Sequence, residues 1–163
     1  MAHLPLIDRI IRRIGNAVCW LFLAAAAVSG YEVFMDSAFG APTIWVHDTT
    51  VMLCATAFLV GGAYAMQRRE HIRISVVYDM MGPRAQWLCD LLAYLLTLAY
   101  LLQLAYFVLD QAAESIAIVE RSGRAWDFPM PMVIRTAFAV GVVLLIAQAL
   151  AQLLRHILAR QSR

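Results

Sequence analysis

The chain has 163 residues, of which 63% are hydrophobic and only 15% are charged, and its mean hydropathy is +0.71. Soluble domains usually carry about 25% charged residues, so this composition excludes an ordinary soluble domain and indicates an integral membrane protein. The net charge of +2 is small and no nucleic-acid-binding motif surrounds the basic residues, which argues against nucleic acid as a partner.

Four apolar segments are each long enough to cross a bilayer, which takes about 20 residues. They run approximately from Gly15 to Phe34, Ile44 to Met66, Trp87 to Leu109 and Met132 to Leu154. The first segment is longer than the apolar core of a signal peptide, so we interpret it as an uncleaved span. The sequence therefore predicts an all-α integral membrane protein, with residues 1–163 forming a single domain of four transmembrane helices.

The arginines predict how these helices are oriented. The chain has 13 Arg and no Lys, and ten of the arginines lie before the first span, between the second and third, or after the fourth. An even number of spans places these three clusters on one side of the membrane, and the positive-inside rule makes that side cytoplasmic. We therefore expect both termini to be cytoplasmic. The other side has only Arg121, Arg124 and Arg135, together with most of the acids.

Two connections carry further information. Residues 67–86 mix apolar and charged side chains, which predicts a short segment lying in the membrane interface between the second and third helices. After Leu109 the helical pattern continues from Asp110 without Gly or Pro until Gly123. We therefore expect the third helix to project beyond the bilayer or to tilt strongly, and to end at Ser122–Gly123.

The spans contain few groups suited to catalysis or transport. The polar side chains near mid-depth are uncharged: Ser29, Thr56, Thr97, Gln103 and Gln148. Asp90 lies about one turn inside the third span. We interpret it as an interfacial carboxylate paired with Arg84 or another basic residue, and the alternative is a proton or ion relay.

The histidines and cysteines indicate neither a metal site nor a cofactor site. Cys19, Cys54 and Cys89 have no metal-ligand spacing, and a haem in a helix bundle would need two histidines at similar depth. His71 and His156 both fall beyond their spans.

No catalytic motif is present, so we expect no enzyme and no cofactor. A four-helix cytochrome-like redox subunit remains the alternative function. A small multidrug carrier would need a membrane-embedded carboxylate, and Asp90 is too close to the interface for that role.

A specific pattern covers the second span and the connection after it. A Trp and an acid begin the span, small residues end it, and a His-Ile-Arg element and a Pro-Arg turn follow. The residues of this pattern are Trp45, Asp48, Gly61, Gly62, Ala63, Arg69, His71, Ile72, Arg73, Asp79, Pro83 and Arg84. The pattern resembles that of the small membrane subunit (DctQ-like) of tripartite ATP-independent periplasmic (TRAP) transporters. The resemblance extends from about residue 15 to residue 155.

This resemblance implies one part of a three-part importer in the bacterial inner membrane. A soluble periplasmic protein captures a substrate, usually an organic acid, and a large membrane subunit carries the transport pathway and the sodium sites. The small subunit binds the large one and helps to receive the loaded periplasmic protein. Its partners would be these two proteins and membrane lipids.

Two sets of contact residues follow from the predicted topology. On the periplasmic side, a docking surface for the binding protein would contain Glu114, Glu120, Arg121, Arg124 and Asp127, and the alternative is a merely solvated loop. On the cytoplasmic side, the motif formed by Arg69, His71 and Arg73 would contact either lipid phosphates or the large subunit. The small residues in the spans serve packing within the chain, docking against another membrane protein, or both.

Overall fold

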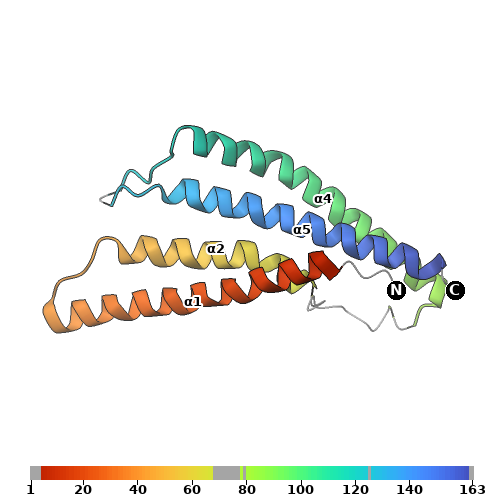
Figure 1. The fold of residues 1–163 in the computed structure, drawn as a ribbon, viewed down its shortest axis with the longest axis horizontal. Helices are drawn as coiled ribbons and strands as arrows, with labels where there is room; N and C mark the ends of the chain where they lie inside the picture. Colours follow the sequence, from red (N-terminus) through yellow and green to blue (C-terminus); the bar gives the residue numbers. More distant parts are fainter. Residues whose placement is uncertain (1–4, 68–77, 79, 125, 162–163) are drawn as a thin grey trace.

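The computed structural model describes residues 5–67, 78, 80–124 and 126–161, and within them it contains four long helices and no strand (Figure 1). The helices are α1 (Pro5–Phe39), α2 (Val46–Gln67), α4 (Pro83–Ala117) and α5 (Met130–Gln161). Each is long and apolar enough to cross a membrane, which confirms the prediction of an all-α protein with four membrane-spanning helices. The predicted interfacial segment, with Arg69, His71 and Arg73, lies outside the described residues.

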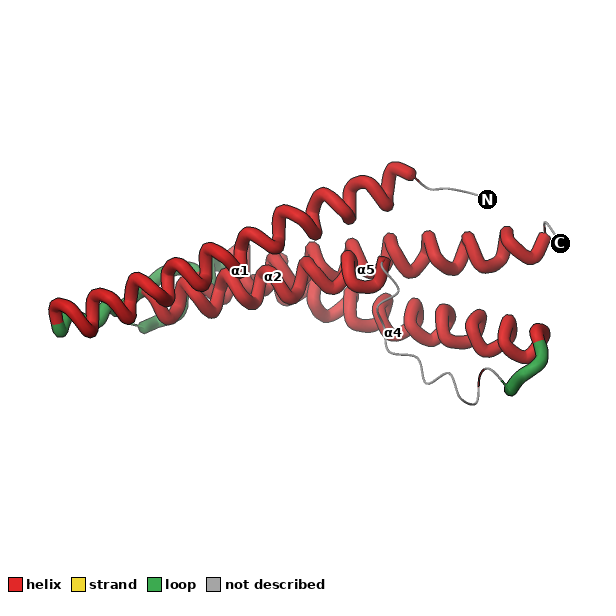
Figure 2. Tube along the Cα trace, turned by 90° about the horizontal axis from the view of Figure 1, so that it is seen from below, coloured by secondary structure: helices red, strands yellow, loops and turns green. Residues whose placement is uncertain are grey.

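The helices pack in the order α1, α2, α5, α4 (Figure 1). α1 lies along α2, α2 along α5 and α5 along α4, whereas α1 touches α5 only weakly. Figure 2 shows the N-terminal part of α1 diverging from α4 and α5. The four helices thus form an open, twisted row in which α1 and α4 are the two edges.

Small residues bring neighbouring helices close together. A side-chain Cβ at Gly15 of α1 would lie 2.5 Å from the ring of Tyr64 on α2, so only glycine fits this contact. Farther along α1, the Ser29 hydroxyl lies 3.3 Å from that of Thr50. Between α2 and α5, a Cβ at Gly141 would lie 2.3 Å from the Leu59 carbonyl oxygen. Close backbone approach through small residues is typical of membrane helices.

The other side of α5 packs on α4 through a regular apolar stripe. Buried side chains at spacings of three and four residues follow one face of α4; they are Leu101, Ala105, Val108, Ala112 and Ser115. Ala139 and Val142 of α5 lie against this stripe. Farther along, Leu101 packs with Ala149 and with Met66, the penultimate residue of α2. The middle of α4 is therefore level with the end of α2, so the two helix pairs are staggered along the row (Figure 1).

Different helix ends lie at the two ends of the row. At one end, Figure 1 shows the start of α1, the last turns of α2, the start of α4 and the last turns of α5. We call this the terminal end, and we call the opposite end, with residues 40–45 and 118–129, the loop end. Two connections at one end and both chain ends at the other are what four membrane-spanning helices require.

The predicted end of the third helix is wrong. α4 continues beyond Asp110, as expected, but it ends at Ala117 and not at Ser122–Gly123. Val119 adopts a left-handed backbone conformation with φ of 49°, and the Glu120 N–H donates to the Ser115 carbonyl at 3.0 Å. This early reversal brings the Glu120 side chain back to α4 and α5, where it finds the polar partners described below.

Candidate interaction site at the loop end

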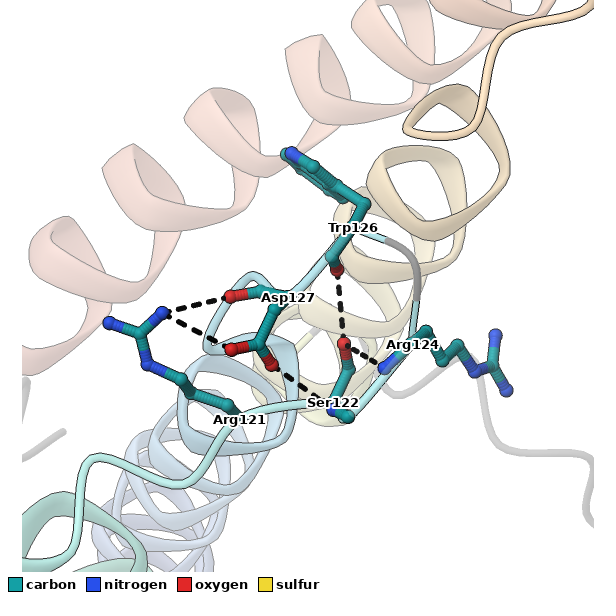
Figure 3. A network of polar contacts seen from close by, with 6 residues as sticks. Arg121, Ser122, Arg124, Trp126 and Asp127 are labelled. Atoms are coloured by element: carbon teal, nitrogen blue, oxygen red, sulfur yellow. Dashed lines mark hydrogen bonds and ion pairs between the residues drawn. The ribbon is translucent and has the colours of Figure 1, made fainter.

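The connection between α4 and α5 is held together by its own polar groups (Figure 3). Arg121 Nη1 donates to the carbonyl oxygen of Asp127 at 3.2 Å and to its carboxylate at 3.3 Å. The other carboxylate oxygen of Asp127 accepts from the Gly123 N–H at 3.2 Å. The Ser122 hydroxyl donates to the Trp126 carbonyl at 3.1 Å. These bonds close a compact loop, in which Gly123 supplies a second left-handed position with φ of 64°.

A long-range ion pair ties this loop to α2. Arg124 Nη1 lies 2.9 Å from Asp48 Oδ1, with the Asp48 side chain only 6% exposed and that of Arg124 64% exposed. Asp48 is in the first turn of α2, where the positive end of the helix dipole also favours a negative charge. A buried carboxylate needs a partner, so Arg124 has a structural role at this position.

A second ion pair connects the same loop to α4 and α5. Glu120 Oε2 accepts from the buried Ser115 hydroxyl at 2.7 Å and lies 2.8 Å from Arg135 Nη1 of α5. The Glu120 side chain is 25% exposed, so it faces inward more than outward. Together the two ion pairs and the internal bonds anchor the loop to three helices.

An open pocket of about 340 Å³ lies between this loop and the start of α5. Its lining combines two guanidinium groups and a hydroxyl with apolar side chains: Ser122, Arg124, Met130, Pro131, Ile134 and Arg135. Both arginines are already neutralised, by Asp48 and Glu120 respectively.

The predicted docking residues therefore separate into two groups. Glu120 and Arg124 hold the loop on the helices, whereas Arg121 and Asp127 form an exposed pair, with side chains 59% and 51% exposed. Glu114 lies exposed on α4, directly before the buried Ser115. The sequence could not separate these roles, because each ion pair joins the loop to a separate helix, Arg124 to Asp48 of α2 and Glu120 to Arg135 of α5.

All three arginines of the loop end are paired with carboxylates. The exposed acids that remain are Asp36, Asp110 and Glu114, and no ion pair links them to another described residue. The Glu32 carboxylate has hydrogen-bond partners in place of an ion pair, since it accepts from the N–H and the hydroxyl of Thr43. The loop end thus presents a surplus of negative charge.

The terminal end carries an aromatic contact between α4 and α5. The ring of His156 stacks on that of Trp87 at 5.5 Å and lies 5.4 Å from that of Tyr94, and its Nε2 is 3.2 Å from the Trp87 carbonyl oxygen. Asp90 accepts a hydrogen bond from the Tyr78 hydroxyl at 2.9 Å. His156 therefore packs at a helix interface, a role that sequence reasoning did not assign to it.

The described residues give no support to a redox site. His47 and His156 lie at opposite ends of the row, and no group of three or more His, Cys, Asp or Glu side chains in the described part of the chain could hold a metal ion. His71, the other histidine weighed for haem ligation, lies outside the residues that the structure describes.

Comparison with known families gives a match over most of the chain. The family described as Tripartite ATP-independent periplasmic transporters, DctQ component, matches residues 25–159. This range covers all of α2, α4 and the connections at the loop end, and most of α5. Comparison with curated proteins gives no match. Four membrane-spanning helices and a family match over most of the chain agree with each other: the chain belongs to the DctQ family and is a small membrane component of a TRAP transporter.

Proposed function

We propose that this chain scaffolds the large membrane subunit of a TRAP transporter and helps to dock the substrate-loaded periplasmic binding protein. The complex would lie in a bacterial inner membrane, with both termini of this chain cytoplasmic, and would import an organic acid coupled to sodium. The observation that carries this proposal is the family match over residues 25–159.

The burial pattern supports the scaffold role. Of the membrane-spanning part of α5, 44% of the residues are buried within the chain, against 11% to 17% for the other three helices. Large apolar side chains cover the remaining surface, for example Leu23 and Phe34 on α1 and Leu96 on α4. An open row of this kind offers broad membrane-embedded surfaces to lipid and to another membrane protein.

The loop end supports the docking role. A loop anchored to three helices keeps its exposed charges in fixed positions, so a partner would bind without first ordering it. Glu114, Arg121 and Asp127 are the predicted docking residues that remain exposed. Charged groups at the rim of an interface contribute chiefly to orientation and association rate.

The test uses all three components reconstituted in proteoliposomes. Reversing the exposed charge of Arg121, with Arg121→Glu, should lower the sodium-dependent uptake rate, while the large subunit still co-purifies. Reversing Arg124 is unsuitable here, because it would place two like charges beside each other at the buried Asp48. Wild-type uptake by the Arg121→Glu variant would contradict the docking role. Uptake that does not depend on a sodium gradient would contradict the proposed coupling.

The motif formed by Arg69, His71 and Arg73 needs its own experiment. We propose that it lies on the cytoplasmic side and contacts either lipid phosphates or the large subunit. His71→Ala should lower recovery of the large subunit if the contact is with protein. Normal assembly and uptake by this variant would mean that the motif contacts lipid phosphates and not the large subunit.

A further inference from the structure

The outward face of α4 carries polar side chains where a lipid-facing helix would be apolar. At 100° per residue, the buried stripe from Leu101 to Ser115 defines one face of α4. From Ala99 to Glu114, the residues on the opposite face are all exposed; they are Ala99, Gln103, Tyr106, Asp110 and Glu114. Tyr106 is 75% exposed. We call these five residues the α4 outer stripe.

Gln103 lies at the depth of the hydrocarbon core. No charged residue occurs between Asp90 and Asp110, so this part of α4 must cross the apolar layer, which is about 30 Å thick. With a rise of 1.5 Å per residue, Gln103 lies roughly 10 Å along the helix from Asp110. A carboxamide exposed to lipid at that depth loses its hydrogen bonds to water and gains no others.

The other edge of the row is different. On α1, Ile11, Val18 and Ala25 are buried and define the inner face. The opposite face, from Trp20 onward, presents Trp20, Leu23, Ala24, Ala27, Tyr31 and Phe34, which are all exposed, and none of these side chains is charged or an amide. This part of the face is apolar and aromatic, as a lipid-facing helix should be. The two edges of the row are therefore suited to different surroundings.

The outer stripe also has an uncompensated charge. Asp110 and Glu114 are one helical turn apart, so their carboxylates repel each other. Neither forms an ion pair with a described residue, whereas the three arginines of the loop end are all paired with other acids. A neighbouring protein with basic side chains at this level would remove the repulsion.

We propose that the α4 outer stripe is the edge that binds the large TRAP membrane subunit, while the outward face of α1 faces lipid. The facing helix would supply a hydrogen-bonding group level with Gln103 and one or more basic residues level with Asp110 and Glu114. This inference rests on the proposed scaffold function and specifies the surface that performs it.

Two alanines at similar positions on the two edges provide a matched test. Ala99→Trp adds a bulky ring to the α4 outer stripe, and Ala27→Trp adds the same ring to the outward face of α1. Each variant is expressed with the large subunit and purified through a tag on this chain. Ala99→Trp should lower the recovery of the large subunit roughly tenfold, equivalent to 1.4 kcal/mol, while Ala27→Trp should leave it unchanged.

A second substitution guards against misfolding of the tryptophan variant. Gln103→Leu should lower the affinity for the large subunit roughly three- to tenfold, the range of one hydrogen bond between membrane helices. The same variant should raise the thermal stability of the chain purified alone, because leucine suits lipid or detergent better than a carboxamide. A photo-reactive side chain at position 103 should cross-link to the large subunit, and one at position 27 should not.

Three results would overturn the inference. Loss of the large subunit with Ala27→Trp but not with Ala99→Trp would assign the contact to α1 and leave the scaffold function intact. Cross-links from position 103 to a second copy of this chain would make the stripe a self-association surface. Failure of the wild-type chain to recover any large subunit would overturn the proposed function together with this inference.

Discussion

The guanidinium of Arg124 lies 2.9 Å from the carboxylate of Asp48, which precedes it by 76 residues. This pair fixes the connection between α4 and α5 on the first turn of α2, and it joins the two halves of the chain at the loop end. Asp48 is buried and Arg124 is largely exposed, so the carboxylate depends on the arginine more than the arginine depends on the carboxylate.

Removing this arginine should destabilise the fold more than removing its exposed neighbour. Arg124→Gln leaves the Asp48 carboxylate buried without its counter-charge, and the exposure of Arg124 limits the loss to about 1–2 kcal/mol of unfolding free energy, less than for a fully buried pair. Arg121→Gln breaks only an exposed pair and should cost about 0–1 kcal/mol. Thermal unfolding of the two variants in the same detergent checks the order. Equal losses would contradict the anchoring role of Arg124.

A glycine-to-alanine change should have opposite effects at two positions of the interface between α2 and α5. A Cβ at Gly141 would meet the Leu59 carbonyl oxygen at 2.3 Å, whereas at Gly62 the nearest atom would be Leu145 Cδ1 at 3.9 Å. Gly141→Ala must therefore push the helices apart, with a loss of about 1–3 kcal/mol. Gly62→Ala should be neutral or stabilising, since Ala is the better helix former by about 1 kcal/mol.

The melting temperatures of these two variants provide the measurement, with the wild-type chain as the reference. A Gly141→Ala protein as stable as the Gly62→Ala protein would mean that α2 and α5 are not in close contact at Leu59.

Two buried glutamines on α5 should respond differently to leucine. Gln148 is fully buried, and neither polar atom of its side chain has a hydrogen-bond partner among the described residues. Gln152 donates to the Met66 carbonyl at 2.8 Å. Gln148→Leu should raise the unfolding free energy by about 1 kcal/mol, because the cost of an unsatisfied buried group disappears. Gln152→Leu should lower it by about 1 kcal/mol, because it removes a satisfied bond.

A thermal unfolding series that includes both single variants tests this prediction. If Gln148→Leu destabilises the chain as much as Gln152→Leu does, Gln148 has a polar partner in the protein.

Val119 should be replaceable by glycine with a gain in stability. Its φ of 49° costs a side-chain-bearing residue about 1–2 kcal/mol, and glycine is free of that cost. Val140 is exposed to a similar degree but lies within α5, where glycine costs about 1 kcal/mol relative to alanine. Val119→Gly should therefore raise the melting temperature and Val140→Gly should lower it. A drop with both variants would show that α4 does not end in this left-handed turn.

The sequence predicted the number and type of the helices, because apolar length alone identifies a membrane span. It did not predict where α4 ends, since the stop depends on Glu120 reaching Ser115 and Arg135 and not on the glycine at position 123. It also could not predict that Asp48 binds Arg124. Residues with similar local sequence therefore differ in role: Arg121 remains exposed, whereas Arg124 holds a buried carboxylate. The order of the helices in the row depends on contacts such as Gly141 with Leu59, which no local pattern specifies.

Native mass spectrometry tests the interface on α4, with the tagged chain co-expressed with the large TRAP membrane subunit and purified in a mild detergent. We expect a complex that contains both proteins, and we expect this complex to be lost in the Ala99→Trp variant but not in the Ala27→Trp variant. Recovery of this chain alone or only as a homo-oligomer, with the large subunit present in the same membranes, would contradict this expectation.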